Sequence, residues 1–337
     1  MVRRRRVFAP KGATKFTLKT LVCLAASVGI LLGASTSIAT KRPARLGGTG
    51  VTSELEIQVL LDRADFSPGE TDGGGGQNSG KTLAAFEAAR GLAPGARNRK
   101  ALLKALGGAA GEPIVTYTIT REDAAGPFSK KIPEGMIEKS KLPGLYYTSV
   151  LQKLGDKFHS APALLKRLNP GARFTAGEHI RVPNVLRTER EALDTARAHA
   201  GGVKVVVSKK TSGLTVYDRN SRIIFYAPVT SGSAHNPLPF GNWEVTEVLR
   251  NPIYNYNPDL FWNADPNGAK AKIAAGPNNP VGVVWIGISK PHYGIHGTPD
   301  PGEIGYSKSD GCVRLTNWDA SRLASLVTKG TRVVFER

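Results

Sequence analysis

Cysteine is almost absent from this chain. Only two of its 337 residues are cysteines, and one of them, Cys23, lies in an apolar N-terminal segment. The other, Cys312, has no cysteine partner, so a disulfide framework and a cysteine-rich zinc site are excluded. The six histidines lack the spacing of zinc ligands, and we expect neither a metal nor another cofactor. A lone thiol is then either a small buried residue or a reactive group.

Long apolar runs are also scarce, and the one near the N-terminus is short. Residues 21–34 are apolar but too few to span a bilayer comfortably, and they follow a basic stretch that includes Arg3 to Arg6. Small residues at 37 and 39 complete the pattern of a signal peptide over residues 1–39. We therefore expect an exported protein of the periplasm or cell envelope, with an uncleaved anchor as the alternative.

Acidic residues are too few to balance the basic ones. The chain has 46 Lys and Arg against 27 Asp and Glu, a formal charge of +19. Removal of residues 1–39 takes away seven Lys and Arg and lowers this charge to +12. The basic residues are scattered, which argues against nucleic acid as a partner, whereas an anionic cell-wall polymer fits. Simple solubility explains the charge equally well, and membrane contact is expected only through the export signal.

The composition changes along the chain and predicts a multidomain protein. A mostly-β C-terminal domain, a β-meander or sandwich with one helix, is preceded by small α and α+β modules. Strands are expected at 203–207, 214–217, 223–229, 241–248, 283–288 and 331–336, and a helix at 318–327 capped by Asn317. The expected parts are a linker (40–50), a helical module (51–110), a connector with one strand (111–140), a second module (141–186), a helical spacer (187–202) and the C-terminal domain (203–337).

The first module has helical spacing at Leu55 and Val59, a Phe66-Ser67-Pro68-Gly69 turn and a second helix with Phe86 at its centre, capped by Asn78 or Ser79. It resembles the peptidoglycan-binding domain family, although a helical hairpin without a ligand has the same pattern. Residues 75–82 match the phosphate-loop pattern, but the preceding residues cannot form the buried strand that this loop requires.

The second module resembles the LysM carbohydrate-binding module. Two short helical segments end at Asn169-Pro170-Gly171, and a turn then leads into the strand Ile180-Arg181-Val182-Pro183. The resemblance implies that this segment contacts glycan, and simple packing is the alternative.

The strongest chemical signal lies near the C-terminus. Cys312 follows Gly311, and His296 precedes Gly297 in a second glycine-containing turn. A thiol and an imidazole are the groups that cysteine acyl transfer needs, because the imidazole accepts the proton and leaves a thiolate–imidazolium pair. The backbone amides of Gly311 and Cys312 are candidates for an oxyanion hole, and the Gly297 carbonyl is a candidate to fix the tautomer of His296.

These turns resemble the L,D-transpeptidase catalytic domain family. The resemblance covers about 135 residues and rests on Ile295-His296-Gly297-Thr298, Ser309-x-Gly311-Cys312-Val313-Arg314-Leu315 and Asp319, with support from Asn251-Pro252-x-Tyr254 and residues 276–282. It implies a cysteine acyltransferase that attacks the tetrapeptide stem of peptidoglycan, releases D-alanine and passes the acyl group to an amine. It also implies acylation by carbapenems, with Cys312 as nucleophile, His296 as base and Gly297 as orienting residue.

Four further residues are candidates for substrate binding: Arg314, Ser309, Tyr293 and Trp285. The acceptor is open between another stem peptide, an envelope protein, a free D-amino acid and water, the last giving a carboxypeptidase. One departure from the family stands before Gly311, where many members have histidine and this chain has Asp310. A carboxylate there opposes a thiolate by like charge, so a non-catalytic peptidoglycan-binding protein is the alternative function.

Overall fold

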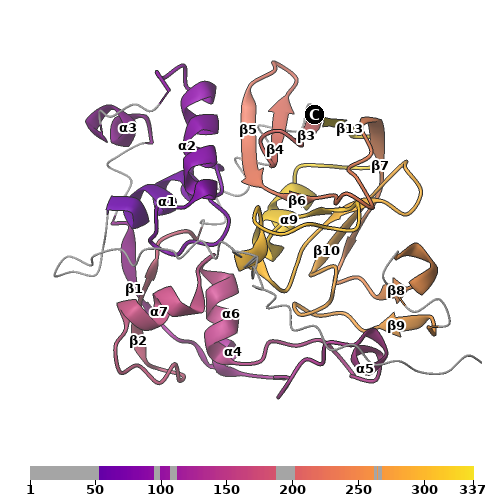
Figure 1. Ribbon diagram of the computed structural model, residues 1–337. Helices are drawn as coiled ribbons and strands as arrows, with labels where there is room; N and C mark the ends of the chain where they lie inside the picture. The colour runs from indigo at the N-terminus through magenta and orange to yellow at the C-terminus, as the bar shows by residue number, and fades with distance from the viewer. Residues whose placement is uncertain (1–52, 95–98, 107–111, 187–201, 262–263, 265–267) are drawn as a thin grey trace, which may run out of the picture. The chain divides into compact units, whose positions relative to one another are not determined.

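The C-terminal part of the chain is built on one nine-stranded sheet (Figure 1). The computed structural model describes residues 53–94, 99–106, 112–186, 202–261, 264 and 268–337. The expected signal peptide, the linker and residues 187–201 of the expected spacer lie outside these residues. The strand order is β5-β4-β3-β13-β7-β10-β11-β12-β6. The strands are β3 (Val203–Ser208), β4 (Gly213–Asp218), β5 (Ile223–Pro228), β6 (Thr230–Ser231), β7 (Gly241–Arg250), β10 (Val284–Ile288), β11 (Gly294–His296), β12 (Val313–Arg314) and β13 (Arg332–Glu336).

Strands β3, β4 and β5 form the antiparallel meander that the sequence predicts. Alternate side chains of a strand point to opposite faces, and here Val205, Val207, Leu214 and Val216 are fully buried. Strand β13 lies parallel to β3 and antiparallel to β7, so the last strand of the chain joins the meander to the rest of the sheet. The mostly-β expectation is confirmed.

One helix, α9 (Asn317–Ala324), packs against β10 and β11. Strand β11 carries the candidate base, His296. Its Leu323 belongs to a core shared by Val205 of β3 and Val313 of β12. The helix begins and ends earlier than predicted. Its cap is Thr316, whose Oγ1 accepts the Asp319 amide at 3.1 Å, so the prediction of Asn317 as the cap and of a helix reaching residue 327 is wrong.

The sequence gives no sign of several elements near the site. Strands of two or three residues are too short to show alternation, and β6, β11 and β12 form only because neighbouring strands supply their partners. The same holds for the hairpin β8 (Tyr254–Tyr256) and β9 (Ala271–Ile273), which pair with each other. Two 3-10 turns, η1 (Pro258–Leu260) and η2 (Pro301–Glu303), complete this part of the chain.

The N-terminal region, meaning the described residues between 53 and 186, starts with helices α1 (Ser53–Arg63), α2 (Gln77–Ala89) and α3 (Arg99–Ala105). Phe86 is fully buried as predicted and meets Phe66 edge-on at 5.2 Å between ring centroids. Helix α2 starts after Gly76 without a side-chain cap, so the predicted capping role of Asn78 or Ser79 is wrong. Each helix among the described residues is too short or too polar to cross a bilayer.

Residues 67–74, which precede the phosphate-loop pattern, form turns and bends with one isolated bridge at Thr71. No strand lies in this stretch of the described chain. A phosphate loop requires a buried strand at this place, so the prediction against nucleotide binding is unchanged.

The strand assigned to the connector belongs to the second module. Strand β1 (Ile114–Thr118) pairs antiparallel with β2 (His179–Pro183), and α6 (Val150–Lys157) and α7 (Pro162–Leu168) lie between them in the sequence. Two short helices, α4 (Arg121–Ala124) and α5 (Met136–Ser140), also come between. The boundary expected at residue 141 is therefore misplaced, because a strand's partner so far along the chain is invisible to local patterns.

The modules do not have separate cores. Leu55 and Val59 of α1 pack in the cluster of α6, α7 and β2, whereas Leu60 and Leu61 of the same helix pack in another cluster with Tyr226 of β5. Backbone hydrogen bonds of 2.8 and 2.9 Å also join Tyr226 to residues 67 and 65. One helix therefore serves both N-terminal modules, and one of its clusters continues into the C-terminal sheet.

Candidate active site

The candidate site lies on three neighbouring strands, β10, β11 and β12. Trp285 is paired with His296, and His296 is paired with Arg314, so these three residues stand in a row across the sheet. Paired residues project to the same face of a sheet. The alternating residues Ile295 and Val313 are fully buried in the core on the other face. The sheet therefore presents an indole, an imidazole and a guanidinium side by side.

Cys312 directly precedes β12 and lies two residues before Arg314. It is a free, half-buried cysteine, and its thiol contacts the carbonyl oxygen of His292 at 3.9 Å. The backbone amide of Gly294 also donates to its sulfur. The fold thus brings the predicted nucleophile to the strand that carries the predicted base.

The ring of His296 is held by the next residue in the chain. Its Nδ1 lies 2.7 Å from the carbonyl oxygen of Gly297, and the histidine is only 4 % exposed. A carbonyl can only accept, so Nδ1 carries the proton and Nε2 keeps its lone pair. This geometry is the one expected for Gly297 as the orienting residue.

Both groups of the pair are neutral at neutral pH. Burial lowers the pKa of His296 to about 4, and the Arg314 charge lowers it too, against the effect of the Gly297 carbonyl. Burial also raises the pKa of the Cys312 thiol, as does the Asp310 charge, against the Gly294 amide and Arg314. These shifts favour a neutral thiol and a neutral imidazole over the thiolate–imidazolium pair expected from the sequence.

Trp285 lies against the imidazole. Its ring stacks on His296 at 5.7 Å between centroids and 21° between planes. Gly294 makes room for it, because a Cβ there would come within 2.6 Å of Trp285 Cζ2. The indole thus packs against the ring of His296 and restricts its orientation.

Ser309 is buried, and its hydroxyl is engaged by backbone groups of the protein. It is 3 % exposed, its hydroxyl accepts the Gly232 amide at 2.6 Å and donates to the Cys312 carbonyl at 2.5 Å. With both partners inside the protein, this hydroxyl fixes the turn that carries the thiol. The sequence shows the residue but not that its partners are backbone groups.

Gly311 is required by the shape of this turn. Its φ is +104°, and a Cβ there would lie 2.6 Å from Cε1 of Tyr293. Tyr293 therefore packs over the residue that precedes Cys312.

We expect Gly311→Ala to destabilise the protein and slow acylation of Cys312, because it adds both backbone strain and a clash with Tyr293. The matched control is Gly330→Ala, where φ is +86° but no atom lies within 4 Å of the added Cβ. Backbone strain alone costs about 1–3 kcal/mol. Urea unfolding should show the larger loss for Gly311→Ala, and only this variant should react more slowly with a thiol reagent. Equal behaviour of the two would contradict the role of the Tyr293 contact.

Tyr254 belongs to the site but was missed in the sequence. Burial raises the pKa of its hydroxyl, and the ionised forms of Cys312, Tyr256 and Asp310 raise it further, while the Arg314 charge opposes them. The β8–β9 hairpin therefore brings this phenol into electrostatic range of the nucleophile. The Asn251-Pro252-x-Tyr254 motif was available as a signal, but nothing in it shows that the hairpin reaches Cys312.

Among the described residues, no group of three or more His, Cys, Asp and Glu side chains is arranged to hold a metal ion.

Comparisons with known proteins identify a family for this chain. The family model of the L,D-transpeptidase catalytic domain, YkuD, matches residues 202–335. The protein YkuD of Bacillus subtilis, named as an L,D-transpeptidase, is 30% identical to this chain over 189 residues. The match covers 56% of this chain and 93% of YkuD. YqjB of the same organism, also named as an L,D-transpeptidase, is 32% identical over 140 residues, 40% of this chain and 71% of its own length.

Solved structures of L,D-transpeptidases are also similar. One from Mycobacterium smegmatis has 19% identity and a TM-score of 0.33, over 40% of this chain and 58% of its own. The catalytic domain from the Enterococcus faecium enzyme has 20% identity and a TM-score of 0.31, over 41% of this chain and 98% of its own. On the strength of the sequence relatives, this chain belongs to the L,D-transpeptidase family.

Proposed function

We propose that this chain is an exported peptidoglycan L,D-transpeptidase with Cys312 as its nucleophile and His296 as its general base. The observation that supports this most strongly is the hydrogen bond between Nδ1 of His296 and the carbonyl oxygen of Gly297. His296 lies on β11, which pairs with β12, the strand that directly follows Cys312. This hydrogen bond leaves Nε2 with a free lone pair, which we propose accepts the proton of the Cys312 thiol. A decayed, purely binding protein has no need for such a fixed, neutral imidazole.

In the first step, the Cys312 sulfur attacks the carbonyl carbon of the L,D peptide bond in a tetrapeptide stem, and its proton passes to His296. The amides of Gly311 and Cys312 are proposed to hold the resulting oxyanion; one such donor contributes about 3–4 kcal/mol in comparable sites. His296 then returns the proton to the leaving nitrogen. The C–N bond breaks, D-alanine leaves, and a thioester remains on Cys312.

In the second step, an amine attacks the thioester carbonyl and gives up a proton to His296. The C–S bond breaks, a new amide forms, and the proton returns to the sulfur. Water in place of the amine gives a carboxypeptidase. Because its pKa is about 4, His296 is neutral at neutral pH and its Nε2 lone pair is free to accept a proton at each attack.

Arg314 is proposed to meet the stem peptide. Its side chain is half-buried, and its charge acts on both Cys312 and His296, so it lies beside the reacting atoms. A guanidinium there is suited to a substrate carboxylate. Tyr293 and Trp285 are proposed as aromatic walls of the same cleft. The peptidoglycan-binding-like and LysM-like segments are proposed to contact the glycan.

The experiment is product analysis with the purified protein lacking residues 1–39 and a disaccharide-tetrapeptide, with and without an added amine. Release of D-alanine together with a crosslinked or amine-exchanged product supports a transpeptidase. Release of D-alanine without exchange indicates a carboxypeptidase. Binding without release overturns the enzymatic proposal in favour of a binding protein.

A further inference from the structure

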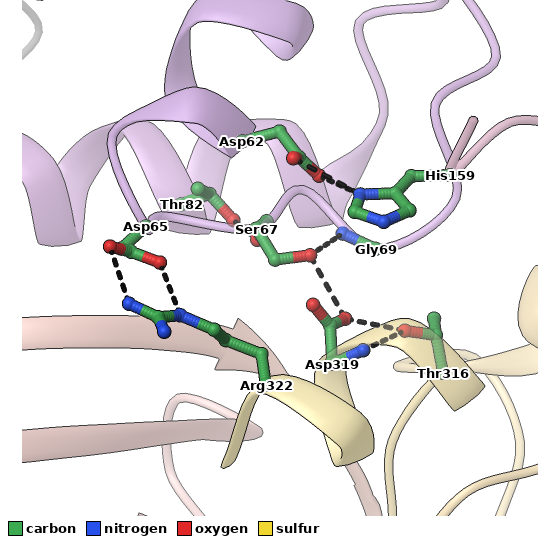
Figure 2. Close-up of polar contacts among 9 residues, drawn as sticks. All are labelled: Asp62, Asp65, Ser67, Gly69, Thr82, His159, Thr316, Asp319 and Arg322. Atoms are coloured by element: carbon green, nitrogen blue, oxygen red, sulfur yellow. Dashed lines mark hydrogen bonds and ion pairs between the residues drawn. The ribbon is translucent and has the colours of Figure 1, made fainter. Parts of the chain in front are cut away.

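The first turn of α9 is held by the N-terminal region at three successive residues. Asn317 hydrogen-bonds to Asp156 of α6, and the indole of Trp318 stacks on His159 at 5.2 Å and 7°. Asp319 Oδ2 accepts a hydrogen bond of 2.9 Å from Ser67 (Figure 2). Each contact joins residues far apart in the sequence, so this turn is an anchoring point for the whole N-terminal region.

The same turn supports the candidate base. Asn317 Oδ1 accepts the Val283 amide at 3.1 Å, and a Cβ on Gly297 would lie 2.4 Å from that oxygen. Asn317 therefore packs directly against Gly297, whose carbonyl holds the ring of His296. A shift of the first turn of α9 would move Gly297 and, with it, the imidazole.

His159 is the charged centre of the junction. Its Nδ1 lies 3.0 and 3.1 Å from the two carboxyl oxygens of Asp62, at the end of α1 (Figure 2). Asp156 of α6 and Asp319 of α9 also act on it, so each helix packed around the ring supplies one carboxyl. The nearby Arg322 of α9 is paired with Asp65 at 2.8 and 3.0 Å. An imidazolium is therefore surrounded by three acids and one aromatic face.

The electrostatics favour the charged ring. Burial by itself lowers the pKa of His159, but the charges of Asp62, Asp319 and Asp156 outweigh it and raise the pKa above its ordinary value. Burial raises the pKa of Asp319 to about 7, against the hydrogen bonds from Thr316 and Ser67 and the His159 charge. Loss of the proton from His159 leaves the acids around a neutral ring, and their repulsion then opposes the junction.

We propose that His159, in its charged form, is a positioning residue that holds the first turn of α9 and thereby fixes His296 for the proposed reaction. The inference rests on the proposed function. It gives the N-terminal region a role in turnover beyond any contact with the cell wall. A group with a raised pKa is charged below that pKa, so turnover should decline as the pH rises through it.

The test is His159→Gln in the protein lacking residues 1–39, with kcat and KM for D-alanine release measured between pH 5 and 9. The matched control is His179→Gln, since His179 is exposed and its ring contacts Thr118. We expect kcat of His159→Gln to fall about tenfold near pH 6 with little change in KM, as for a misplaced catalytic group. The alkaline decline of the wild type should also disappear in this variant.

A second variant, His159→Arg, keeps a positive charge at every pH and should keep its turnover into the alkaline range where the wild type declines. Unchanged kcat and an unchanged pH profile in His159→Gln would overturn the inference, as would a loss of kcat that only follows the loss of folded protein by circular dichroism. If the wild type itself has no turnover, the proposed function fails. The imidazole nitrogen resonances of His296 then still decide the inference, because only His159→Gln should shift them.

Discussion

Replacing Cys312 with alanine is expected to abolish D-alanine release, by about 10⁴-fold or more, since the residue supplies the atom that forms the thioester. The fold should persist, because Cys312 is half-buried and its thiol has only the weak contact with the His292 carbonyl at 3.9 Å and the Gly294 amide. Turnover is measured by D-alanine assay, and folding by circular dichroism and a urea titration.

The same variant has a second readout that is independent of the acceptor. Intact-mass analysis after incubation with a carbapenem should show one adduct on the wild type and none on Cys312→Ala. Cys312 is the only free cysteine among the residues that the structure describes, so the adduct can be assigned to this thiol. Full turnover in the alanine variant would refute the proposed nucleophile outright.

Loss of His296 should have the next largest effect. We expect His296→Gln to lower kcat/KM by about 10²–10⁴-fold, the usual contribution of a positioned general base. His292→Gln is the matched control. The backbone carbonyl of His292 contacts the thiol, but the residue is exposed, and turnover should persist. Large loss in His292→Gln with none in His296→Gln would reverse the assignment.

The pH dependence gives His296 a distinct signature. The base must be neutral to accept a proton, and burial places its pKa at about 4. The acid limb of kcat/KM should therefore fall only as the pH drops through about 4, well below the value for a solvated histidine of about 6.5. An acid limb near pH 6.5 that is absent in His296→Gln would show that the ring is more solvated than its burial implies.

The effect of Asp310 follows from the same electrostatics. Its charge raises the pKa of Cys312, as the like-charge argument from the sequence predicts. Arg314 and the Gly294 amide act in the opposite direction. In the proposed chemistry the proton transfer accompanies the attack, so a neutral thiol is compatible with it. The aspartate does not by itself argue for a decayed site.

Sequence patterns predicted those features that depend on local chemistry. The period-two runs of β3, β4 and β5 and the buried position of Phe86 follow from side-chain alternation and helical spacing. The pairing of Gly297 with His296 involves adjacent residues, so it also could be foreseen. The glycine before the nucleophile was visible for the same reason.

Other features depend on contacts between distant segments. The role of Ser309 is set by the Gly232 amide, and the role of Trp285 by the missing side chain of Gly294. Strand β1 pairs with β2, which comes much later in the sequence. Tyr254 lies near Cys312 because of the fold of its hairpin. None of these partners is marked by a local pattern.

The sequence by itself thus determined the candidate reacting groups, a thiol and an imidazole in glycine-containing turns, and the mostly-β character of the domain around them. Only the tertiary structure decided their charge states, because desolvation and the Arg314 charge arise when separate strands meet. It also decided that the N-terminal region is joined to α9, since Ser67, Asp156 and His159 find their partners only in the folded chain. Burial and long-range pairing have no signature in a single run of residues, and for that reason they had to be read from the fold.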